Sequence, residues 1–271
     1  MPRWNLDDLS WAQFEPAQVD PDLLRVVKAA ALVEYNGGHY ARYLRSVFRE
    51  DESFCALTYG WAEEEVQHGL ALGRWAELAD PDFSLAEAAA AFTVAFQIPT
   101  DLSRSVRGSC SGELVARCIV ETATSSFYSA LRDAATEPVL KDLCARIAAD
   151  EYRHYKLFYR HMQPYLRSEG MGQLARLRLA LARMREGDDD ELAMAYYYGN
   201  GAKGAYDRRA NSQAYGFRAY RLYRPGHCQR AVKMILKACG LNPQGWLASC
   251  GSWLLWRMLR RYVTSGQAKA A

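Results

Sequence analysis

The sequence predicts an all-α fold: a four-helix bundle with a crossover helix between its second and third helices, followed by a C-terminal helical extension. Alternating runs of Val, Ile and Thr, which would indicate strands, are absent. Long segments instead carry apolar residues at helical spacing. The connections between these segments follow the order short, long, short, which distinguishes this bundle from a simple up-and-down arrangement.

The first two helices are expected to form an antiparallel pair. The first is predicted over 21–50, because Asp20 and Pro21 supply a capping residue and a first-turn proline. The second is predicted over 51–78. Since almost no residues separate them, the two helices should be antiparallel neighbours.

A long connection and a second helical pair follow. The Asp-Pro-Asp sequence at 80–82 ends the second helix, and the alanine-rich stretch 85–96 is predicted to form the crossover helix. The third helix is expected over 109–136 and the fourth over 138–166, opened by a proline. This succession is the ferritin-like topology.

The chain changes character after the fourth helix. We therefore expect a bundle over 1–166 and a basic helical extension over 167–271 that packs on it. Residues 187–225, rich in Gly, Tyr and Arg, are expected to be irregular. The rest of the extension should contain three helices, over 173–185, 228–239 and 246–263.

Cysteine usage and the chain's N-terminal residues favour a cytoplasmic protein. The seven cysteines are scattered and form no C-x-x-C pair, which fits reduced thiols better than a disulfide framework. Residues 1–10 are charged and lack the apolar core of a signal peptide. No apolar run is long enough to span a bilayer.

The motif Glu-x-x-His occurs twice, at Glu65–His68 and at Glu151–His154, and each copy follows a lone glutamate in an apolar helical context. Residues three apart share one helix face, so each copy can offer a carboxylate and an imidazole to one metal. The set suits two iron ions, or manganese, with positions left open for oxygen. The predicted ligands are Glu34, Glu65, His68, Glu121, Glu151 and His154.

Several residues near these motifs have two interpretations. The predicted ligands could lie on exposed helix faces, but their apolar neighbours favour a bundle interior. Tyr128 lies two turns after Glu121 and could contact the site as a hydrogen-bond donor or a redox-active group, or be an ordinary core tyrosine. His39 and His161 are either additional ligands or structural residues.

Three segments resemble the soluble acyl-carrier-protein desaturases, in the same order and at similar spacing over about residues 30–160. Residues 61–69, WAEEEVQHG, resemble that family's W-x-A-E-E-x-x-H-G with one shift. Residues 147–154, IAADEYRH, resemble I-A-A-D-E-x-R-H, and residues 121–124, ETAT, resemble E-x-A-T. The acid that follows H-G in the plant enzymes is Leu70 here, and the chain beyond about residue 167 shows no match.

The resemblance implies a member of the ferritin-like di-iron carboxylate superfamily, which uses O2 and external electrons to oxidise a fatty acyl chain. It would place Thr124 beside bound oxygen and make Asp150 and Glu64 acceptors for the ligand imidazoles. Trp4 or Trp11 would be an electron-relay residue. The implied partners are an acyl-carrier protein and a ferredoxin-type electron donor, and a homodimer is expected.

Other functions are compatible with the same predicted metal ligands. One is a different di-iron oxygenase, such as a hydroxylase or an N-oxygenase of a small metabolite, which would differ only in its pocket. Another is a non-enzymatic, iron-binding ferritin-like protein, for which the C-terminal extension is unexpectedly long. A ribonucleotide reductase small subunit is disfavoured, because Leu72 stands where that family's radical tyrosine is expected.

The C-terminal part of the chain is strongly basic. Residues 203–271 hold 13 Lys or Arg and one acid, a balance of +12 against +3 for the whole chain. We expect an acidic protein partner there, with no nucleic acid, and the densest run is Arg208, Arg209, Arg218, Arg221 and Arg224. The alternatives are a solvated surface or a peripheral membrane contact through Trp246, Trp253, Leu254, Trp256 and Arg257.

Overall fold

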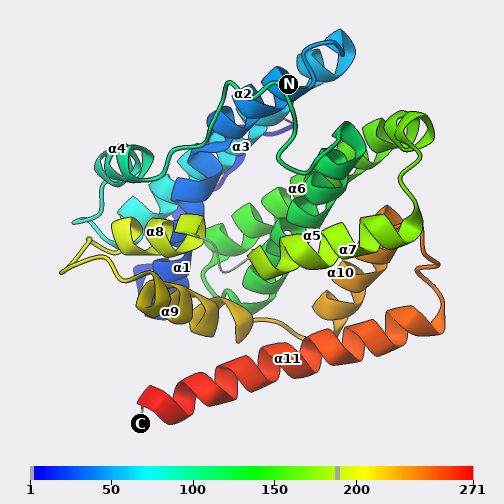
Figure 1. Ribbon diagram of the computed structural model, residues 1–271. Helices are drawn as coiled ribbons and strands as arrows, with labels where there is room; N and C mark the ends of the chain where they lie inside the picture. The colour runs from blue at the N-terminus through cyan, green and yellow to red at the C-terminus, as the bar shows by residue number, and fades with distance from the viewer. Residues whose placement is uncertain (1–2, 187–189, 271) are drawn as a thin grey trace. The chain divides into compact units, whose positions relative to one another are not determined.

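The computed structural model describes residues 3–186 and 190–270, and within these ranges every regular element is helical (Figure 1). This confirms the all-α class, while the ferritin-like topology stays a prediction. The chain forms two compact units. Unit 1 comprises Met1–Asp101, Leu131–Ala145 and Asp188–Ala219, and unit 2 comprises Leu102–Ala130, Arg146–Gly187 and Tyr220–Ala271. These units cut across the predicted boundary after residue 166, so that boundary also stays a prediction.

Unit 1 opens with three single turns of 3-10 helix and is otherwise α-helical. The turns are Leu6–Asp8, Trp11–Gln13 and Pro16–Gln18. Its helices are α1 (Pro21–Tyr35), α2 (Gly37–Val47), α3 (Glu52–Ala79), α4 (Leu85–Ala95), α8 (Asp190–Gly199) and α9 (Arg208–Tyr220), whose last residue belongs to unit 2. Unit 1 also contains the last residues of α5 (Cys110–Ala134) and the first residues of α6 (Pro138–Glu169).

The prediction of one helix over 21–50 is wrong, because the chain breaks at Asn36 into α1 and α2. The predicted cap is present: the Asp20 carboxylate accepts hydrogen bonds from the first-turn amides. At the break, Asn36 Oδ1 lies 2.5 Å from Nδ1 of His39, and two glycines follow. A side-chain bond to a neighbour and weak helix formers together favour ending the helix there.

The prediction that 187–225 is irregular is also wrong, since α8 and α9 occupy much of it. The helix α8 packs against α1 and α4 and buries Ala193, Ala195 and Tyr196. Its last residue, Gly199, approaches α1 so closely that an added Cβ would lie 3.1 Å from the carbonyl carbon of Lys28. Small residues thus permit tertiary packing that outweighs the poor helix propensity of the segment.

Unit 2 contains most of α5 (Cys110–Ala134) and α6 (Pro138–Glu169), together with α7 (Gln173–Arg185), α10 (Pro225–Ala238) and α11 (Trp246–Ala270). The bounds of α7 match the predicted 173–185. The helix α10 begins before the predicted residue 228, because the amide of Arg224 donates to Nδ1 of buried His227 at 3.0 Å and caps its start. No helix in the described ranges combines the length and the apolar character needed to cross a bilayer.

The turn between α5 and α6 belongs to unit 1 and is built around Glu137. This carboxylate is 1% exposed. It accepts hydrogen bonds from Nε1 of Trp75 at 2.7 Å and from the amide of Leu140 at 2.7 Å. Its other oxygen accepts from the amide of Glu15 at 3.2 Å. Glu137 is therefore a well-bonded structural carboxylate that caps the start of α6.

Candidate metal centre

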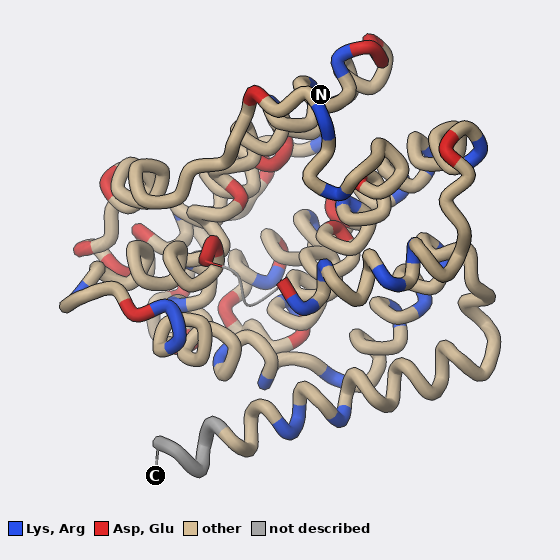
Figure 2. Tube along the Cα trace, viewed as in Figure 1, with Lys and Arg blue, Asp and Glu red and all other residues tan. Residues whose placement is uncertain are grey.

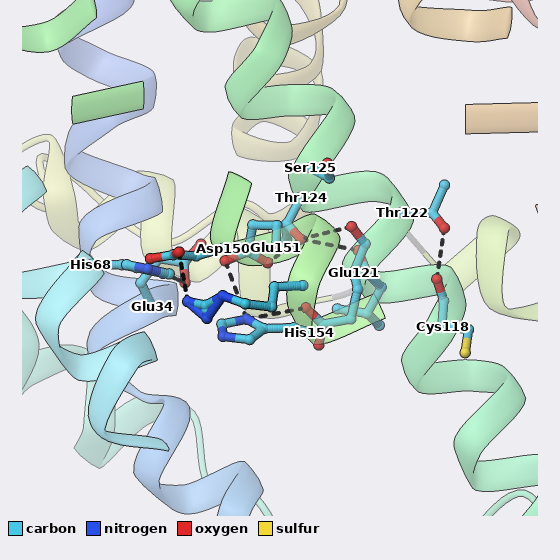
Figure 3. Close-up of polar contacts among 12 residues, drawn as sticks. Glu34, His68, Cys118, Glu121, Thr122, Thr124, Ser125, Asp150, Glu151 and His154 are labelled. Atoms are coloured by element: carbon cyan, nitrogen blue, oxygen red, sulfur yellow. Dashed lines mark hydrogen bonds and ion pairs between the residues drawn. The ribbon is translucent and has the colours of Figure 1, made fainter. Parts of the chain in front are cut away.

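Unit 1 brings together the first three predicted ligands, Glu34, Glu65 and His68. Glu34 lies in the last turn of α1, while Glu65 and His68 lie one turn apart on α3. All three are buried, at 4%, 9% and 0% exposure, and offer ligand atoms within 4.8 Å of one another. Nδ1 of His68 is 3.7 Å from Oε2 of Glu34 (Figure 3). We call these residues the unit 1 triad.

Two glycines allow the backbone around Glu34 to approach α3. A Cβ at Gly69 would lie 2.5 Å from the backbone nitrogen of Tyr35, and a Cβ at Gly37 would lie 2.4 Å from Cβ of Glu65. Neither distance is tolerable for a real side chain, so glycine is required at both positions. The sequence interpretation missed this role, although Gly69 directly follows the ligand histidine.

Unit 2 brings together the other three predicted ligands, Glu121 on α5 and Glu151 and His154 on α6. Their exposures are 2%, 1% and 2%. Nδ1 of His154 lies 3.7 Å from Oε2 of Glu121 and 3.7 Å from Oε1 of Glu151 (Figure 3). The three offer ligand atoms within 4.8 Å of one another. This unit 2 triad repeats the composition of the unit 1 triad, with one glutamate from the preceding long helix and a Glu-x-x-His pair.

The donor atoms of both triads fit a divalent metal ion. An ion about 2.1 Å from two ligand atoms holds them roughly 3 to 3.6 Å apart, close to the 3.7 Å between imidazole nitrogen and carboxylate oxygen in both triads. The described residues supply no hydrogen bond to these two Nδ1 atoms. Carboxylate and imidazole together suit iron, manganese or zinc. Buried groups of this kind could hold a metal ion, and the donor chemistry of both triads agrees with that.

Thr124 contacts the unit 2 triad directly. Its hydroxyl is 2.5 Å from Oε2 of Glu151 and donates a hydrogen bond to it (Figure 3). Ser125, the next residue, donates to the backbone carbonyl of Ala148 on α6 at 3.2 Å. Hydroxyls on α5 therefore fix both the backbone of α6 and the carboxylate of one predicted ligand. The predicted position of Thr124 beside oxygen stays a prediction.

Of the two candidate relay tryptophans, Trp4 lies beside a predicted ligand. Its buried ring stacks on His68, with ring centroids 6.0 Å apart and planes inclined by 10°. Trp11 instead donates from Nε1 to the carbonyl of Leu6 and lies under the guanidinium of Arg74. An electron-relay role for Trp4 stays a prediction.

The predicted supporting residues are buried, and their roles stay predictions. Asp150 is 4% exposed and accepts a hydrogen bond from Nη2 of Arg153 at 2.6 Å. Glu64 lies next to the ligand Glu65 on α3 and is 7% exposed. Tyr128 is buried, and its ring packs edge-on against Phe127.

Other nearby groups are poor ligand candidates. Burial, and then the charge of Glu121, raises the pKa of the Cys118 thiol, which keeps it protonated and unreactive. His39 is engaged with Asn36, and burial lowers its pKa. Neither His39 nor His161 joins a group of potential metal ligands among the described residues.

The predicted partner-binding arginines fall into two kinds. Two of them make ion pairs within unit 1: Arg208 lies 3.3 Å from Asp190, and Arg218 lies 2.8 Å from Asp22. Arg208 is nevertheless exposed, as are Arg209, Arg221 and Arg224. Docking of an acidic partner by these arginines stays a prediction.

No protein-family model matches the chain, and no curated protein matches it either. The functional inference therefore depends on the residues of the two triads and on the segments that surround them.

Proposed function

We propose that this protein is a non-haem di-iron oxidase that uses O2 and external electrons to oxidise an unactivated carbon–hydrogen bond. The substrate we propose is a fatty acyl chain on an acyl-carrier protein. The observation that carries the proposal is the repeated triad, in which both histidine Nδ1 atoms lie 3.7 Å from a buried glutamate of another helix. Two such triads, in the order found here, form the ligand set of carboxylate di-iron centres.

Under this proposal the two triads together hold two iron ions, with manganese as the alternative metal. Bound iron would supply the redox chemistry that activates O2. The protein's own residues would do the rest. Burial of the six ligands excludes water. The Thr124 hydroxyl orients the Glu151 carboxylate. The ring of Trp4 offers a route for electrons to His68.

The acyl substrate is proposed from the three sequence segments and from the chemistry of the centre. Desaturation removes two hydrogens from adjacent carbons. With O2, two external electrons and two protons, it yields an alkene and two water molecules, so a separate electron donor of the ferredoxin type is required. An acidic acyl-carrier protein would suit the exposed arginines of the C-terminal part, because guanidinium groups bind carboxylates and phosphate in a bidentate manner.

Metal analysis tests the ligand assignment first. Protein produced with iron supplied should contain about two iron ions per chain. The Glu65→Ala/Glu151→Ala double variant removes one carboxylate from each triad and should lose both ions. Glu137→Gln, at a carboxylate of similar burial that is already hydrogen-bonded, is the matched control and should retain them. A metal-free wild type, or a double variant with unchanged iron, would overturn the assignment.

Turnover tests the reaction. The iron-loaded protein, given a ferredoxin reducing system, O2 and acyl chains on a carrier protein, should convert them to products lighter by two hydrogens, as mass spectrometry would detect. A product heavier by one oxygen would indicate a hydroxylase instead. If the protein only oxidises and accumulates iron, with no organic product from any acyl substrate, the storage function replaces this proposal.

A further inference from the structure

The last helix, α11, exposes large apolar side chains although it packs against α10 along its other face. Ala248 is its buried contact residue, at 4% exposure. The exposed apolar residues are Trp246 at 73%, Leu247 at 40%, Trp253 at 59%, Leu254 at 52% and Met258 at 58%. An exposed patch with two indoles is unusual on a protein surface and marks a site of interaction.

The exposed face of α11 continues from these apolar residues into basic ones. Trp246, Trp253 and Arg257 are separated by seven and four residues and so lie along one stripe of the helix. Arg260 and Arg261 flank that stripe and are exposed. The first half of the face is thus aromatic and aliphatic, and the second half is cationic.

The charged residues of this part of the sequence are all basic. After Arg224 the sequence holds seven Lys or Arg and no Asp or Glu. Figure 2 shows basic positions and no acidic ones along the described part of α11. Two of the arginines lie against exposed or half-buried indoles: the Arg257 guanidinium is 5.1 Å from the Trp253 ring centroid, and that of Arg260 is 5.9 Å from that of Trp256. Such pairs keep cations beside the rings that would enter an interface.

We infer that α11 is an interfacial helix that binds the surface of a bilayer containing anionic lipids. Indoles favour the boundary between headgroups and acyl chains, and the leucines and Met258 would add buried apolar area. The arginines would bind lipid phosphates, and the uncompensated positive charge would attract an anionic surface. Because no described helix can cross a bilayer, the contact would be peripheral.

An anionic lipid surface explains α11 better than an acidic protein partner. An acidic partner accounts for the arginines, but it does not require exposed indoles, leucine and methionine on the same face. A lipid surface uses both halves of the face at once. The inference goes beyond the proposed oxidase function, and it stands independently of metal content and turnover.

Sedimentation with vesicles tests the inference on the full chain. The wild type should co-sediment with vesicles of phosphatidylcholine and phosphatidylglycerol in equal parts, far less with phosphatidylcholine alone, and less at high salt. The Trp253→Ala/Leu254→Ala variant should bind about tenfold more weakly, because it removes apolar area from the interface. The Arg257→Gln/Arg260→Gln/Arg261→Gln variant should bind about a hundredfold more weakly.

Tyr59→Ala is the matched control. Tyr59 on α3 is 59% exposed, as Trp253 is, and lies under a guanidinium, that of Arg45 at 4.2 Å. Its loss should leave vesicle binding unchanged. Circular dichroism would establish that each variant keeps the wild-type helix content. If a variant fails to fold, quenching of wild-type tryptophan fluorescence by brominated anionic lipids supplies the same test.

Three results would overturn the inference. One is a wild type that does not bind anionic vesicles. Another is vesicle binding that the α11 variants leave unchanged. The last is a wild type that does not bind vesicles but that forms a dimer or binds an acidic carrier protein, together with α11 variants that lose this dimerisation or affinity. That result would assign α11 to a protein interface.

Discussion

Replacing one predicted ligand glutamate by glutamine should make the metal-free protein more stable and weaken its response to metal. In the unit 1 triad, Glu34 is 4% exposed and its Oε2 atom lies 3.7 Å from Nδ1 of His68. Taking a carboxylate out of water costs several kcal/mol, and a bound cation would compensate for that cost. Glu34→Gln and, in the unit 2 triad, Glu121→Gln each remove one such charge while keeping the side-chain volume.

The gain in stability without metal and the loss of stabilisation by metal can each be given a magnitude. Without metal, each substitution should raise the free energy of unfolding by about 1–3 kcal/mol, because burying a neutral amide costs less than burying a carboxylate. With Fe²⁺ at a hundred times its dissociation constant, one bound ion stabilises the wild-type fold by about 2.7 kcal/mol. A triad that has lost a ligand should keep less than about half of that stabilisation.

Urea denaturation monitored by circular dichroism under anaerobic conditions, with and without Fe²⁺, measures the stability of the metal-free protein and its stabilisation by metal. Glu137→Gln is the control. That carboxylate is 1% exposed but accepts bonds from Trp75 Nε1 and from backbone amides. Its loss should destabilise the protein by about 1–3 kcal/mol and leave the response to metal intact. If Glu34→Gln behaves as Glu137→Gln does, the Glu34 carboxylate is structural and our reasoning is wrong.

Substitutions at Thr124, at two glycines and at Asp80 have further predicted effects. Thr124→Val should reduce iron affinity or turnover about tenfold, because the Thr124 hydroxyl donates a hydrogen bond to Glu151 and would orient its carboxylate. Thr124→Ser keeps a hydroxyl and should restore both. Equal iron affinities of the two variants in a titration would exclude an orienting role for the hydroxyl. Gly69→Ala should destabilise the fold by about 1–3 kcal/mol, because its Cβ would clash with the Tyr35 backbone. Gly38→Ala, in open space on α2, should stabilise it by about 0.5–1 kcal/mol. Thermal melts measure both, and a Gly38→Ala variant less stable than Gly69→Ala would contradict the packing. The hydrogen bond from Lys28 lowers the pKa of the Asp80 carboxyl, whose side chain is 35% exposed. This pair should therefore stabilise the fold by no more than about 1 kcal/mol. That stabilisation is present above the unfolded pKa of about 3.9 and is lost as the pH falls through the folded pKa. The stabilities of the wild type and Asp80→Asn should therefore differ at neutral pH and converge in strong acid, and a difference that grows in acid would refute this.

The sequence could predict the triads because their spacing is a local property. Glu65 and His68 share a face of α3 whatever surrounds them, and the same holds for Glu151 and His154 on α6. The lone glutamates were harder to assign as ligands from the sequence, because Glu34 reaches its triad only through a close approach of α1 to α3. Glycine in the α3 sequence indicates that contact but does not identify its partner.

What the sequence could not predict depends on contacts between distant segments. We predicted one continuous helix across Asn36, but the bond between Asn36 and His39 and the two glycines that follow favour ending α1 there. The helices α8 and α9 form where Gly, Tyr and Arg suggested an irregular segment, because α8 buries alanines and Gly199 against α1. Packing of this kind overrides local preference and is invisible to a count of helix-forming residues.

Each triad lies within one compact unit, which would affect metal loading if the proposed centre forms. Three ligands suffice to bind an ion, so a chain loaded in only one unit would be an expected step in the assembly of that centre. Imidazole and carboxylate ligands bind zinc and copper more tightly than ferrous iron. Under this proposal, a half-loaded chain would be the stage at which a competing metal enters. Correct loading would depend on which metal is supplied to the newly folded chain, and on how quickly the second ion follows the first.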